Sequence, residues 1–287
     1  MSTASSTASS TASSMARSAA PSSATSTASG PRLVSDAITV TWRNILNLRR
    51  NPQVLVFSTV QPVIFVLLFR YVFGGAINVG KVPGFPSPLK YVNYLMPGIF
   101  AQTITFGAVN TAVGLADDLN KGIIDRYRSL PMARSAVLIG RTLADLARNV
   151  FVVILMILVG FAVGFRYSTS FLGLVAGALV IFGFAFALSW VFATVGLYIG
   201  NAEAAQAASF PLLAPLTFAS SAFVAVKHMP GWLQPFARNQ PVTVVIDAVR
   251  HLVLGGPTSA AVVKALVWIV GIVAVFAPLA VARYRRS

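Results

Sequence analysis

From Asp117 to Arg148 the chain reads DDLNKGIIDRYRSLPMARSAVLIGRTLADLAR, a charged stretch that lies between long apolar runs. It contains four of the chain's seven acidic residues, interleaved with lysine and arginine. Such a density of charge favours a surface that another protein contacts, and a solvated loop that only orients the chain in a membrane is the alternative. Pro131 is expected to divide the stretch into two short helices, the second over Ala136–Arg148 with Ser135 as its N-cap.

The composition is far more apolar than that of a soluble protein. Of the 287 residues 56% are hydrophobic and 10% are charged, and the mean hydropathy is +0.76. A soluble domain of this length cannot bury so much apolar surface, so the sequence predicts an all-α integral membrane protein. The net charge of +15 does not indicate nucleic-acid binding, because the arginines flank apolar runs, as orientation signals and contacts with anionic lipids do. The absence of cysteine and the presence of only two histidines predict no metal site.

Six apolar runs approach the roughly 20 residues that ~30 Å of hydrocarbon requires. Most of the 22 lysines and arginines lie before the first run, between the second and third, and after the sixth. By the positive-inside rule, both termini and the charged stretch are therefore expected in the cytoplasm. The predicted spans are Val54–Phe73, Val92–Ala116, Val150–Phe165, Phe171–Ile199, Ala204–Val226 and Ser259–Ala282.

Three segments outside these runs have distinct patterns. Residues 1–31 are rich in serine, threonine and alanine and are expected to be a disordered tail, followed by a membrane domain over 32–287. Apolar residues recur at helical spacing over Val34–Arg50, which predicts an amphipathic helix in the headgroup layer. Between the fifth and sixth runs, two short re-entrant helices are expected over Gly231–Ala237 and Pro241–Leu254, with Asp247 and Arg250 paired on the second.

The spans carry polar residues and prolines but no acidic residue near their centres. The chain therefore lacks the carboxylates of a proton relay, and active transport needs an energy source outside the spans. The prolines serve packing or gating, with packing favoured, and the neutral polar residues either line a substrate path or join neighbouring helices. The candidate residues of a path or gate are Gln102, Asn110, Pro211, Pro215, Thr217, Phe218 and Phe223.

Two motifs resemble a known family. The segment KGIIDR at 121–126, followed by LP at 130–131 and LIGR at 138–141, resembles the loop between spans two and three of ABC-2 type permeases, which have the type V exporter fold. The segments SAFV at 221–224, MPGWLQPF at 229–236 and NQPVT at 239–243 are similar to the daunorubicin-resistance permeases within that family. The resemblance covers about residues 33–282.

This resemblance implies a cytoplasmic coupling helix between spans two and three. Two copies of a separate ABC ATPase would contact that helix and the amphipathic N-terminal helix, and a second permease chain would complete the assembly as a homodimer or a related heterodimer. Where the family carries glutamate before its Lys/Arg-Gly pair, this chain has Asp117-Asp118-Leu119-Asn120. The residues implied in coupling are Trp42, Arg43, Asp117, Asp118, Lys121, Gly122, Asp125, Arg126 and Arg128.

The chain contains no G-x-x-x-x-G-K-[ST] motif, so ATP and Mg are expected in the partner ATPase and the chain itself is expected to be a permease rather than an enzyme. Its expected location is a bacterial cell membrane, and its expected substrate is an amphipathic drug, natural product or lipid. A secondary carrier or channel for a hydrophobic solute is the alternative function. A membrane-embedded transferase or protease is disfavoured, because no catalytic pair lies at membrane depth.

Overall fold

The computed structural model describes residue 41 and residues 52–72, 90–122 and 134–286, and every regular element within these ranges is helical. Helix α7 (Phe171–Ile199) lies at the centre of the bundle. It contacts α3 (Tyr91–Gly107), α4 (Val109–Asn120), α6 (Arg134–Val163), α8 (Ala202–Phe218), α10 (Pro241–Leu254) and α11 (Thr258–Arg286). Helix α2 (Pro52–Tyr71) packs on the outer side, against α3 and α6.

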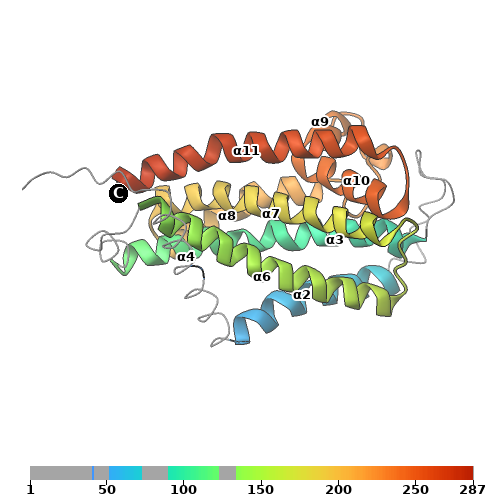
Figure 1. Cartoon of the computed structure of the whole chain (residues 1–287), viewed down its shortest axis with the longest axis horizontal. Coiled ribbons are helices and arrows are strands. Elements are labelled where there is room, and N and C mark those ends of the chain that lie inside the picture. Colours follow the sequence, from blue (N-terminus) through green and yellow to red (C-terminus); the bar gives the residue numbers. More distant parts are fainter. Residues whose placement is uncertain (1–40, 42–51, 73–89, 123–133, 287) are drawn as a thin grey trace, which may run out of the picture.

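The long helices run up and down along one axis (Figure 1). The end of α4 and the end of α11 lie at the same end of the bundle, whereas α9 (Gln234–Asn239) and α10 lie at the opposite end. Thr41 also lies near the first end, because its hydroxyl donates a 3.1 Å hydrogen bond to the carbonyl oxygen of Gly140 in α6. Residues 117–122 at the end of α4 and the C-terminal end of α11 thus share one end of the bundle, and the side of the membrane on which this end lies stays a prediction.

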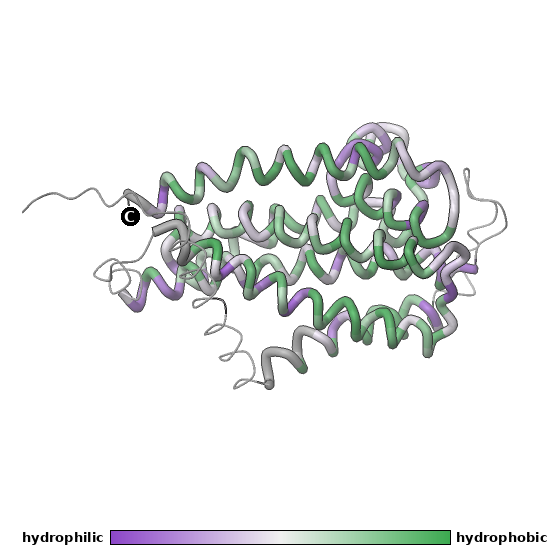
Figure 2. The backbone as a smooth tube through the Cα atoms, viewed as in Figure 1, coloured by the Kyte–Doolittle hydropathy of each residue, from purple (hydrophilic) through white to green (hydrophobic). Residues whose placement is uncertain are grey.

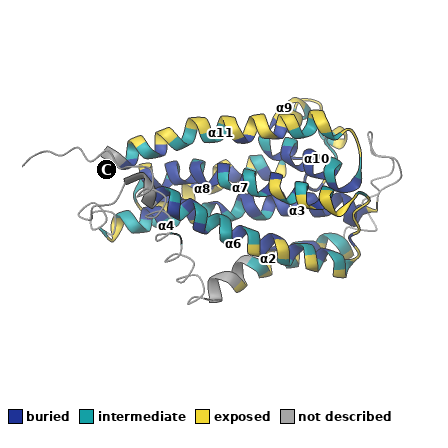
Figure 3. Cartoon of the chain, viewed as in Figure 1, coloured by how far each residue is buried: buried dark blue, intermediate teal, exposed yellow. Residues whose placement is uncertain are grey.

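Apolar side chains cover the outside of the bundle as well as its core. The apolar residues follow the lengths of α6, α7 and α11 (Figure 2), and much of the outer side of α11 is exposed (Figure 3). Val267 and Val270 of α11 are 66% and 64% exposed. Water is a poor solvent for such a surface and lipid is a good one, so this face is suited to a bilayer. Within the described residues, four segments are long and apolar enough to cross a membrane, namely Tyr91–Asn120, Leu138–Val163, Phe171–Ile199 and Thr258–Tyr284.

The predicted second span is broken at Ala108, which separates α3 from α4. In a continuous helix the carbonyl oxygen of Gly107 would accept from the amide of Thr111, but that amide donates to Ala108 instead, at 3.0 Å. Arg148 and Asn110 supply the missing donors to Gly107, at 2.9 and 3.3 Å. The break is therefore stabilised by side chains that insert into the helical hydrogen-bond series.

Two predicted boundaries are wrong. The expected short helix Ala136–Arg148 and the expected third span Val150–Phe165 form a single helix, α6, which begins at Arg134, so Ser135 lies inside it and is not its N-cap. Arg141 and Asp145 of this helix contact Asp118 and Thr111 of α4, so these charged residues have partners and the helix continues from them into its apolar part. The expected fifth span Ala204–Val226 is helical only to Phe218, after which the chain forms turns and a 3-10 helix (Val226–His228).

Other boundaries agree closely with the sequence analysis. Helix α7 has the predicted bounds, because Ser170 caps its first turn and Gly200, at φ 69°, ends it in the left-handed conformation. Helix α10 also has the predicted bounds, with Pro241 in its first turn and Gly255, at φ 92°, after its last residue. The predicted Gly231–Ala237 helix is found as Gln234–Asn239. Apart from Thr41, the amphipathic N-terminal helix and the tail over 1–31 lie outside the described residues.

Candidate functional site

Helices α4 and α6 are joined by a series of polar contacts. Near the end of α4, Asp118 forms an ion pair with Arg141 of α6. Farther along, the hydroxyl of Thr111 donates a 2.6 Å hydrogen bond to Asp145, which lies 3.7 Å from the guanidinium of Arg148. Because Arg141, Asp145 and Arg148 are spaced four and three residues apart, they share one face of α6.

The predicted coupling residues that the structure describes lie at the outer end of this series. Asp117 and Lys121 form an exposed 2.6 Å ion pair, with 41% and 62% of their side chains accessible. The hydrogen bond to Asp117 raises the pKa of Lys121. Gly122 follows α4 at φ 63°, where its amide donates to the carbonyl oxygen of Leu119. Glycine suits this position because a side chain would strain the left-handed backbone.

The remaining predicted coupling residues lie outside the described part of the chain. They are Trp42, Arg43, Asp125, Arg126 and Arg128.

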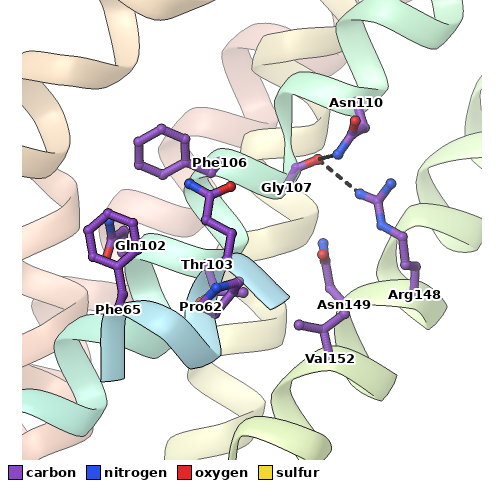
Figure 4. A pocket seen from close by; sticks show the side chains of 11 residues that line it. Pro62, Phe65, Gln102, Thr103, Phe106, Gly107, Asn110, Arg148, Asn149 and Val152 are labelled. Atoms are coloured by element: carbon purple, nitrogen blue, oxygen red, sulfur yellow. Dashed lines mark hydrogen bonds between the residues drawn. The ribbon is translucent and has the colours of Figure 1, made fainter. Parts of the chain in front are cut away.

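A cavity lies between α2, α3 and α6, at the break between α3 and α4. Figure 4 shows the rings of Phe65 and Phe106 on one side, and Arg148 with Asn149 on the other. Two of the residues predicted for a substrate path, Gln102 and Asn110, are brought together in its wall. The complete lining is Gln61, Pro62, Phe65, Gln102, Thr103, Phe106, Gly107, Asn110, Arg148, Asn149 and Val152.

Asn149 is the most unusual residue of this wall. It is 3% exposed, and its side-chain Nδ2 has no hydrogen-bond partner among the described residues. Arg148 beside it is 6% exposed and uses Nη2 to hold the carbonyl oxygen of Gly107. A buried amide donor without a partner is unfavourable by about 1–3 kcal/mol, so Asn149 Nδ2 is a donor that an acceptor in the cavity would stabilise.

The other predicted path residues do not reach this cavity. Pro211 and Pro215 share one face of α8, as their spacing predicts, and both are exposed. Thr217 is fully buried, whereas Phe218 is 59% exposed. Phe223 is buried and stacks on Phe69 of α2, with ring centroids 4.5 Å apart. Of the residues predicted for a substrate path or gate, only Gln102 and Asn110 therefore line the cavity.

At the opposite end of the bundle, Arg250 fixes the segment that follows α8. Its Nε donates to the carbonyl oxygen of Tyr94, Nη1 to the hydroxyl of Ser221, and Nη2 to the carbonyl oxygen of Ser221. The guanidinium also stacks on the ring of Tyr94, 3.6 Å from its centroid. The predicted pair with Asp247 is confirmed at 3.2 Å, yet Arg250 is 2% exposed and makes many more contacts than that pair.

The sequence analysis missed Asn149 and Arg148 as cavity residues and Arg250 as a buried anchor. For the first two a signal was present, because Arg141, Asp145, Arg148 and Asn149 recur on one side of an apolar helix. Such a row of polar residues within a membrane helix indicates a polar partner or a cavity. For Arg250 the sequence provides no signal of burial.

Comparison with known proteins identifies the family. Residues 36–254 match the family model described as ABC-2 type transporter. The chain belongs to the ABC-2 type transporter family. It is 35% identical over 254 residues to the daunorubicin resistance ABC transporter permease protein DrrB1 of Streptomyces coeruleorubidus, covering 88% of this chain and 87% of the relative. It is 28% identical to a probable doxorubicin resistance ABC transporter permease of Mycobacterium tuberculosis, over 88% and 90% of the two chains.

A more distant relative is the putative transport permease ycf38 of Cyanophora paradoxa, which is 24% identical over 76% of this chain and 74% of its own. The relatives support the assignment of this ABC-2 protein as a multi-pass membrane permease of an ABC exporter. The family match ends at Leu254, the last residue of α10, and so includes both the cavity and the Arg250 anchor.

Proposed function

We propose that the chain is the permease subunit of an ATP-driven exporter that moves an amphipathic drug, natural product or lipid out of a bacterial cell. It spans the cell membrane six times with both termini in the cytoplasm, and it pairs with a second permease chain. Two copies of a separate ABC ATPase dock at the end where α4 finishes, and they hold ATP and Mg. The family membership and the named functions of the relatives support this proposal.

One structural observation carries the proposal: the polar contacts between α4 and α6 run from the exposed end of α4 to the cavity. Asp118 contacts Arg141 at one end of the series, and Arg148 contacts both Asp145 and Gly107 at the other. A force on the end of α4 is therefore transmitted to the helix break, through contacts that are fixed by charge and hydrogen bonds.

The helix break provides the moving part of this mechanism. Because the carbonyl oxygen of Gly107 is held by side chains and not by the amide of Thr111, the junction has one regular helical hydrogen bond fewer to resist a rotation of α4 relative to α3. Closure of the ATPases would displace α4, and the cavity wall formed by Arg148 and Asn149 would move with it. The cavity would then release its occupant toward the outer side.

A secondary carrier is the alternative. Proton- or sodium-driven carriers use acidic residues at the transport site, and no aspartate or glutamate is among the described residues that line this cavity. The nearby Asp145 is engaged by Thr111 and Arg148. The described cavity therefore fits an ATP-driven exporter better than an ion-coupled carrier.

The test is purification of the tagged full-length chain from its native membrane in mild detergent, followed by mass spectrometry of the co-purifying proteins. We expect an ATPase with a Walker motif at one copy per permease. Transport that is driven by a proton or sodium gradient, with the purified chain alone in vesicles, would contradict the proposal.

A further inference from the structure

The cavity between α2, α3 and α6 has a wall chemistry that selects among amphipathic molecules. The rings of Phe65 and Phe106 form an apolar side that a flat ring system can contact (Figure 4). This side determines the shape of the occupant, and the opposite side determines its polarity.

The polar side offers donors. Asn149 Nδ2 is buried without a partner among the described residues, and Arg148 adds a positive charge in the same wall. The other polar groups are already engaged: Thr103 donates its hydroxyl proton to the carbonyl oxygen of Ile99 at 2.7 Å, and Asn110 donates to Gly107. The donors that remain for a ligand are therefore those of Asn149 and Arg148, the second N–H of Asn110, and the side-chain amides of Gln61 and Gln102.

The charge of this wall is one-sided. The lining contains one guanidinium and, among the described residues, no carboxylate. Asp145 is close to Arg148, but its carboxylate accepts from Thr111 on the α4 side and does not line the cavity. A cationic amine placed in the cavity would thus face Arg148 with no carboxylate among the described lining residues, because Asp145, the partner of Arg148, lies outside the lining. A carbonyl, phenolate or carboxylate would instead accept hydrogen bonds from the wall.

We infer that this cavity binds the flat, acceptor-rich end of the exported molecule, neutral or anionic, and discriminates against an ammonium group there. The inference rests on the proposed export function, since it names the chemistry of the substrate at that site. It differs from a general preference for amphipathic molecules, because it predicts which of two equally apolar molecules binds more tightly.

The probes are three molecules that share one fluorescent ring system: dansylamide, which is neutral, dansylglycine, which is anionic, and dansylcadaverine, which is cationic. The full-length chain is placed in nanodiscs of phosphatidylcholine, and the fluorescence of empty nanodiscs is subtracted. We expect dansylamide and dansylglycine to bind at least about tenfold more tightly than dansylcadaverine, since the difference is one charge-assisted hydrogen bond. Tightest binding by dansylcadaverine, or no saturable binding by any probe, would overturn the inference.

The variant Asn149→Asp keeps the shape of the side chain and places a carboxylate beside Arg148. We expect it to reduce the preference for dansylglycine over dansylcadaverine by about tenfold. The control is Lys227→Gln, an exposed residue of the recess beside Arg250, which should leave the order of the probes unchanged. An unchanged order in Asn149→Asp, or a change in Lys227→Gln, would place the probes elsewhere and overturn the inference.

The experiment uses the permease without an ATPase, so its result is independent of the energy source. If the ATPase co-purifies and the probe order fails, the proposed function stands and this inference does not. If the probe order holds and no ATPase is found, the cavity chemistry stands and the exporter proposal does not.

Discussion

The guanidinium of Arg148 in α6 donates a 2.9 Å hydrogen bond to the carbonyl oxygen of Gly107, the last residue of α3. This contact joins two membrane helices at the point where one of them is interrupted. It also places a buried positive charge in the wall of the cavity. One interaction thus stabilises the break, links α6 to α3 and determines the polarity of the site.

Replacement of Arg148 by alanine should destabilise the chain. It removes the hydrogen bond to Gly107 and the partner of Asp145, which we expect to lower stability by about 2 kcal/mol. The thermal unfolding midpoint of the purified variant measures the effect. The control is Arg238→Ala, since Arg238 is exposed and bonds only Gln234 among the described residues. An equal midpoint for both variants would show that the Gly107 contact contributes little.

The exposed pair Asp117–Lys121 should matter for coupling and not for folding. We expect the double variant Asp117→Asn with Lys121→Gln to change stability by less than about 0.5 kcal/mol, because exposed ion pairs contribute little. Substrate-stimulated ATP hydrolysis by the reconstituted complex should fall severalfold. Normal substrate stimulation of ATP hydrolysis in the double variant would show that Asp117 and Lys121 do not contribute to the ATPase contact.

Asp118 differs from its neighbour, because its partner Arg141 is partly buried against α4 and occupies the space beside Gly114. We expect Asp118→Asn to lower both the unfolding midpoint and ATPase stimulation, by about 1–2 kcal/mol in stability. The unfolding midpoint and the ATPase stimulation together distinguish the pair Asp118–Arg141 from the exposed pair Asp117–Lys121. A loss of stimulation with unchanged stability would place Asp118 at the ATPase surface instead.

A methyl group at Gly98 should be poorly tolerated. A Cβ there would overlap the backbone carbonyl of Ala222, and backbone cannot move aside as a flexible side chain can. We expect Gly98→Ala to destabilise the chain by about 1–3 kcal/mol. The same substitution at Gly271 of α11 is the matched control, because nothing described lies within 4 Å of its added Cβ. There alanine should be neutral or stabilising by up to about 1 kcal/mol, as helix propensity predicts.

Lysine should not replace Arg250, although the charge is kept. The guanidinium donates to Tyr94, Ser221 and Asp247 from three nitrogens in a fixed plane, whereas an ammonium group has a single nitrogen. We expect Arg250→Lys to lower stability by about 3 kcal/mol and to increase proteolysis of residues 219–230. Arg238→Lys, at an exposed position, is the control. Resistance to protease equal to that of the unmodified chain would contradict the role of Arg250 as an anchor.

Several features of the fold follow from local signals in the sequence. The bounds of α7 and α10 were predictable because the signals that start and stop them, Ser170 and Gly200 for one and Pro241 and Gly255 for the other, act on the adjacent turn. The membrane class and the family motifs were also readable, since they depend on composition and on the order of residues.

The break at Ala108, the continuity of α6 and the cavity were decided by tertiary structure. The donor that stabilises the break lies 41 residues away, on another helix, so no window of sequence around Gly107 contains it. Arg148 is 6% exposed because α6 packs against α3 and α4. The sequence by itself determined which residues are apolar and where α7 and α10 begin and end, whereas the partner of each buried polar group was decided only when the helices packed. The reason is that an unpaired polar group in a low-dielectric interior is unfavourable until another helix supplies its partner.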